Sequence, residues 1–112
     1  MALDNDQRIT YLANVIAVAR ANGQLSPRES DALEQIQKRI GAKKSDLNKA
    51  HALAESSDFK VCPVGHFADK VQNLEDLIYV SMVDGALDEG EKPVILEFAK
   101  QIGISQEQLV RS

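Results

Sequence analysis

Apolar residues recur along this chain at steps of three and four, which places them on one face of successive helices. Four stripes can be read, and each is long enough for a helix. They are Ile9, Leu12, Ile16 and Ala19; Leu33, Ile36 and Ile40; Leu74, Leu77, Ile78 and Met82; and Ile95, Phe98, Ala99 and Ile102. No stretch alternates apolar and polar residues between turn signals, as a half-buried strand would. The pattern therefore predicts an all-α fold.

Capping residues set the expected helix limits. The segment Ser26–Glu29 (SPRE) is typical of a helix start, because serine caps backbone N–H groups, proline suits the first helical position and glutamate completes a capping box. Asp88–Glu91 repeats that offset with an aspartate as the cap. Gly41 and Gly103 each follow the last apolar residue of a stripe and fit helix C-termini.

Further helices are expected outside the clearest stripes. A short one is predicted over residues 45–55 with Ser45 as its cap, and Ser105 should begin a final turn or two. The connector, which we define as residues 56–65 (SSDFKVCPVG), leads into a long helix over about residues 66–83. The total is a compact bundle of five to six helices.

The two halves of the chain resemble each other at an offset of 62 residues, over approximately residues 8–50 and 70–112. Matched pairs include Leu12 with Leu74, Ile16 with Ile78, Asn22-Gly23 with Asp84-Gly85, Glu29 with Glu91, and Gly41 with Gly103. Two copies are too few for a solenoid. The repeat predicts one domain over residues 1–112, built from two helix–turn–helix halves related by a pseudo-two-fold axis.

Composition narrows the class of protein. The chain is 112 residues long, with 44% apolar residues, 27% charged residues and a net charge of -4, as in ordinary soluble domains. The negative balance argues against nucleic acid binding, which needs a surplus of Lys and Arg. A single cysteine, Cys62, cannot form an internal disulfide, and no apolar run approaches the roughly 20 residues of a membrane span. We expect a soluble, cytoplasmic protein without a transmembrane segment.

The stretch VDGALDEGE, residues 83–91, resembles the second half of a calcium loop. Asp84, Gly85, Leu87 and Glu91 agree with EF-hand positions 5, 6, 8 and 12. Positions 1 and 3, however, fall on Val80 and Met82, which cannot ligate calcium. A complete EF-hand site is therefore not predicted.

Two interpretations of this stretch remain. In the first it joins two helices, since Gly85 suits a helix end and Asp88 and Glu91 a helix start. That interpretation leaves the charges of Asp84 and Glu89 unexplained. In the second, Asp84, Asp88 and Glu91 hold a weakly bound, partly hydrated Ca²⁺ or Mg²⁺ ion.

Two charged surfaces are candidates for partner binding. The acidic patch consists of Asp76, Asp84, Asp88, Glu89 and Glu91. The basic cluster consists of Lys38, Arg39, Lys43 and Lys44. Cations at a helix C-terminus favour the helix dipole, and a docking surface for an acidic partner or membrane head groups is the second explanation for the basic cluster.

Zinc binding and catalysis have little support. Cys62, His51 and His66 are fewer than the four ligands of a structural zinc site, so we expect a buried thiol and a histidine near a helix start. No catalytic residue is predicted. Four aromatic residues at helical spacing are expected in the core: Tyr11, Phe67, Tyr79 and Phe98.

The paired segments, Asp84-Gly85 with Glu91 and Asn22-Gly23 with Glu29, each follow a long apolar helix. In this they resemble the D-G-x-x-x-x-x-E signature of the tellurite-resistance TerB-like family. The resemblance implies a small all-α module of bacterial or phage origin, linked to chemical stress, phage defence and membrane-associated complexes, without catalytic activity. It also implies metal association through acidic residues, although Asn22 replaces a carboxylate in the first copy.

The expected function is therefore a non-catalytic interaction module in bacterial or phage stress response or defence. It would bind a protein partner through the acidic patch. The alternative is a divalent-metal-binding protein that uses carboxylates of the second copy.

Overall fold

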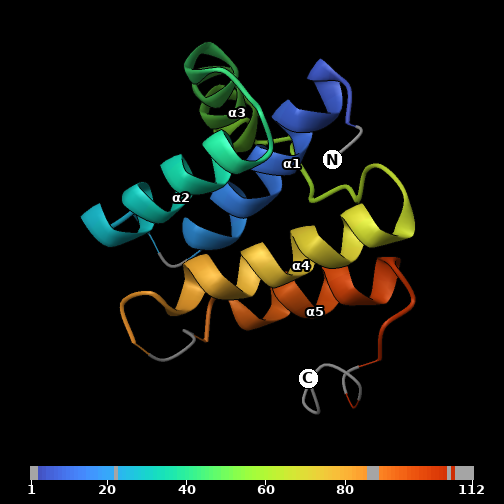
Figure 1. Ribbon diagram of the computed structural model, residues 1–112. Helices are drawn as coiled ribbons and strands as arrows, with labels where there is room; N and C mark the ends of the chain where they lie inside the picture. Colours follow the sequence, from blue (N-terminus) through green and yellow to red (C-terminus); the bar gives the residue numbers. More distant parts are fainter. Residues whose placement is uncertain (1–2, 22, 86–88, 106, 108–112) are drawn as a thin grey trace.

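The computed structural model describes residues 3–21, 23–85, 89–105 and 107. Five helices make up this part of the chain: α1 (Asn5–Ala19), α2 (Pro27–Arg39), α3 (Lys44–Glu55), α4 (Phe67–Met82) and α5 (Lys92–Gln101) (Figure 1). No strand occurs among the described residues, so the all-α prediction is confirmed, with five helices in the described ranges. None of the described helices is both long and apolar enough to cross a bilayer.

Helix α1 is the central element of the fold. It contacts α2, α3 and α4, and α4 in turn contacts α2 and α5, which lies alongside it (Figure 1). Every residue from Tyr11 to Ile16 is fully buried, so α1 is enclosed around most of its circumference. The apolar stripe predicted only one buried face. The wider burial follows from the run YLANVIAVA, residues 11–19, which carries apolar side chains on several sides of the helix.

The predicted capping box at the start of α2 is confirmed. Ser26 Oγ accepts the Glu29 N–H at 3.1 Å, and Glu29 Oε1 accepts the Ser26 N–H at 2.8 Å. Helix α4 begins after His66, close to the predicted start, and Asp69 Oδ2 accepts the His66 N–H at 2.9 Å. Short-range polar contacts therefore fix both helix starts.

Two helix starts differ from the prediction. Helix α3 is capped at Lys43 rather than Ser45, because Asp46 Oδ2 accepts the Lys43 N–H at 2.9 Å and so moves the start upstream. Helix α5 begins at Lys92, later than Asp88–Glu91 predicts, and residues 89–91 form a turn. Pro93 explains this shift, since it has no N–H to donate to residue 89 and is tolerated only in a first helical turn. Asp88 lies outside the described residues.

The ends of α2 and α5 are built identically, as the glycine positions predicted. Gly41 has φ +78° and Gly103 φ +83°, the left-handed conformation that favours glycine. Both ends form a Schellman motif. The paired N–H to carbonyl bonds are Gly41 to Lys38 (3.1 Å) and Ala42 to Gln37 (3.0 Å), and Gly103 to Lys100 (3.1 Å) and Ile104 to Ala99 (2.8 Å).

The turns after α1 and α4 also repeat. Gly23 and Gly85 have φ +134° and +129°, and each donates its N–H to the carbonyl three residues before it at 3.0 Å. The backbone therefore repeats at the sequence offset of 62 residues. This recurrence is consistent with the predicted duplication of a helix–turn–helix unit.

We expect Gly41→Ala and Gly103→Ala each to destabilise the protein by about 1 kcal/mol, because alanine is strained in the left-handed region. No heavy atom lies within 4 Å of the added Cβ at either site, so backbone conformation alone sets the cost. Urea unfolding should show similar, additive losses, and Gly41→Asn should lose less because asparagine tolerates this conformation. Strongly unequal losses would contradict the equivalence of the two helix ends.

Candidate functional site

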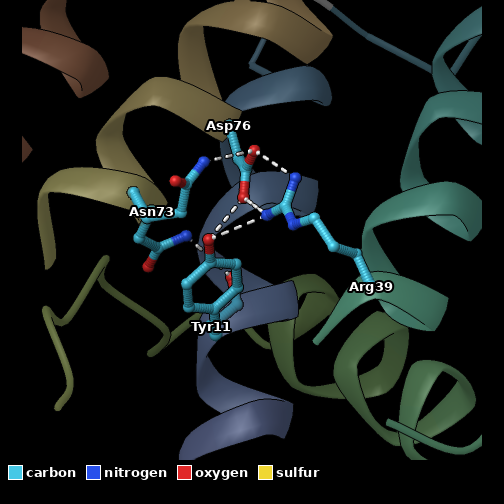
Figure 2. Close-up of polar contacts among 5 residues, drawn as sticks. Tyr11, Arg39, Asn73 and Asp76 are labelled. Atoms are coloured by element: carbon cyan, nitrogen blue, oxygen red, sulfur yellow. Dashed lines mark hydrogen bonds and ion pairs between the residues drawn. The ribbon is translucent and has the colours of Figure 1, made fainter. Parts of the chain in front are cut away.

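Four polar side chains are buried where α1 crosses α4: Tyr11, Asn14, Asn73 and Asp76, of which Figure 2 labels Tyr11, Asn73 and Asp76. The Tyr11 hydroxyl donates to the Asp76 carboxylate, and Asn14 Nδ2 donates to Asn73 Oδ1 at 2.9 Å. The offset of 62 maps Tyr11 onto Asn73 and Asn14 onto Asp76. The Tyr11–Asp76 bond and the Asn14–Asn73 bond therefore join equivalent pairs of positions, with the two copies of the repeat exchanged. Contacts are repeated in this way at an isologous two-fold interface.

Arg39 of α2 covers the buried carboxylate of Asp76. Its Nη1 donates to Oδ1 at 3.2 Å and its Nη2 donates to Oδ2, a bidentate pair, while Nη2 also lies 3.3 Å from the Tyr11 hydroxyl (Figure 2). The side chain of Asp76 is 4% exposed and that of Arg39 is 47% exposed. Arg39 therefore lies between the buried carboxylate and the solvent. It also links α2 to the α1–α4 crossing.

The ionisation of this cluster follows from its surroundings. Burial raises the pKa of Tyr11 well above its ordinary value of 10.0, and the hydrogen bond to Asp76 and its negative charge raise it further. The hydrogen bond to Asp76 also raises the pKa of Arg39. Tyr11 is consequently held as a neutral donor and Arg39 as a cation.

The Arg39–Asp76 pair lies in a groove of about 410 Å³ between α2 and α4, which we call the α2–α4 groove. Its lining residues are Gln35, Ile36 and Arg39 from α2 and Gln72, Glu75, Asp76 and Tyr79 from α4. Tyr79 is 51% exposed and Met82, one turn further along α4, is 49% exposed. Tyr79 thus places a half-exposed aromatic side chain on the wall of a polar groove, which makes this surface a candidate binding site.

The prediction that four aromatic residues belong to the core is half right. Tyr11 and Phe98 are fully buried, but Phe67 is 62% exposed and Tyr79 lies at the surface. Helix α4 buries the face that carries Leu74 and Leu77, and its outer face is left to Tyr79 and its neighbours. Helical spacing alone does not separate these two faces, because both carry apolar residues.

The structure divides the predicted acidic patch. Asp76 is buried at the α1–α4 crossing and Glu91 is 1% exposed, so neither belongs to a surface patch. Asp84 and Glu89 are exposed, and Glu89 forms an ion pair with Lys92 at 2.9 Å. Asp88 lies outside the described residues. Asp76 was misassigned because its position between Leu74 and Leu77 lies on the buried side of α4, where a carboxylate needs an internal partner.

No group of three or more His, Cys, Asp or Glu side chains within the described ranges is arranged to hold a metal ion. The set predicted for Ca²⁺ or Mg²⁺ was Asp84, Asp88 and Glu91. Because Asp88 falls in the gap at residues 86–88, that site stays a prediction.

The basic cluster does not form one uniform surface. Arg39 is directed to Asp76, and Lys44 lies 3.4 Å from Glu34 in an exposed ion pair. Lys38 and Lys43 are exposed. The stabilisation of the helix end by cations therefore remains the simpler explanation for this cluster.

Cys62 differs from the prediction of a buried thiol, since it is exposed. Its backbone is held firmly, because Asn14 Nδ2 donates to the Cys62 carbonyl and Asn14 Oδ1 accepts the Cys62 N–H, both at 2.9 Å. Asn14 thus fastens the connector to α1. An asparagine inside the apolar run YLANVIAVA is the sequence signal that could have revealed this contact.

Comparisons with known proteins leave the family open. No protein-family model, curated protein or solved structure matches the chain. The resemblance to the TerB-like family therefore stays a prediction based on the two repeated segments. The site is interpreted from its own geometry.

We expect Tyr11 to remain un-ionised until the protein unfolds. Because its folded pKa is raised, the stabilisation it contributes is present below pH 10 and is lost as the pH rises above that value. Tyr79→Phe leaves Tyr11 as the single tyrosine, so absorbance at 295 nm reports it directly. Phenolate should form together with the loss of helical circular dichroism. Formation of phenolate near pH 10 while the protein is still fully helical would contradict the raised pKa of Tyr11.

We expect Arg39→Met to destabilise the protein by about 2 kcal/mol, because it leaves the charge of Asp76 buried without its cation. The loss stays below that for a fully buried pair, since solvent screens the half-exposed Arg39. Adding Asp76→Asn should recover roughly half of it in urea unfolding. Lys43→Met removes an exposed cation nearby and serves as the control, and an equal effect of both single changes would refute the pairing.

Proposed function

We propose that the protein is a non-catalytic interaction module that binds a protein partner through the outer surface of α4. Tyr79 and Met82 are about half exposed there, between the exposed carboxylates of Glu75 and Asp84. Exposed apolar side chains rimmed by polar residues are typical of interaction sites. The exposure of Tyr79 beside the α2–α4 groove is the observation that carries the proposal.

The chemistry of the groove favours binding over catalysis. Its most buried carboxylate, Asp76, already accepts hydrogen bonds from Arg39 and Tyr11. A carboxylate that is buried and paired in this way contributes to helix packing and offers little surface to a substrate. The side chains at the rim, by contrast, are accessible to a partner.

The setting is taken from the sequence resemblance. A TerB-like module would act in bacterial or phage stress response or defence, in the cytoplasm, and as one component of a larger complex. Of the acidic residues that the sequence suggested for the binding surface, Asp84 and Glu89 are exposed, and Glu75 adds a further exposed carboxylate on α4.

A random peptide library displayed on phage and selected against the full chain tests this proposal. Selected peptides should bind at least fivefold more weakly to Tyr79→Ser and to Asp84→Lys, because both changes alter the proposed surface. Phe67→Ser is the matched control, since it removes an exposed aromatic side chain from the other end of α4, outside the α2–α4 groove. A selection without binders, or equal sensitivity to Tyr79→Ser and Phe67→Ser, would contradict the proposal.

A further inference from the structure

We draw no further inference here: the strongest candidate, the groove of about 590 Å³ between α1 and α5 whose walls include Ala17, Phe59 and Val94, carries none because nothing in the structure shows what covers this apolar surface.

Discussion

Helices α1, α2 and α4 are linked through one buried carboxylate, that of Asp76. Asp76 lies at the crossing of α1 and α4 with 4% of its side chain exposed, and an unpaired charge there would cost several kcal/mol. Arg39 and Tyr11 remove that cost by donating to it from α2 and α1. The position of α2 is therefore tied to the crossing by a charge as well as by apolar contacts, and the groove beside Arg39 follows from this arrangement.

The two halves solve the same packing problem with different residues. One copy has Asn14, whose side-chain amide can both donate a hydrogen bond to a backbone carbonyl and accept one from a backbone N–H. The other copy has Asp76 at this position, and its carboxylate can only accept hydrogen bonds. The neutral amide holds the connector, and the carboxylate holds an arginine. This single difference ties the connector to α1 in one copy and α2 to α4 in the other.

Much of the fold could be predicted because its signals are local. The capping box at Ser26, the glycines at 41 and 103 and the apolar stripes each depend on residues a few positions apart. The start of α5 differs from the prediction because the repeat points to Asp88–Glu91, whereas Pro93 allows the helix to begin only at Lys92.

The site was harder to predict because its contacts span long separations. Arg39 and Asp76 are 37 residues apart, and each looked like a surface charge when its own segment was considered alone. Burial of Asp76 could be anticipated from its register between Leu74 and Leu77, but the identity of its cation could not. The exposure of Tyr79 depends on which helix covers α4, and the apolar pattern does not contain that information.

The reciprocal contacts of Tyr11 with Asp76 and of Asn14 with Asn73 also bear on the history of the chain. Two identical chains that pair about a two-fold axis make every off-axis contact twice in this way. The core of the present protein therefore has the layout of a homodimer interface enclosed within one chain. In a homodimer any substitution changes both copies of a contact at once, whereas a fused chain can alter one copy alone. The predicted duplication would therefore explain how the positions of Asn14 and Asp76 could come to differ.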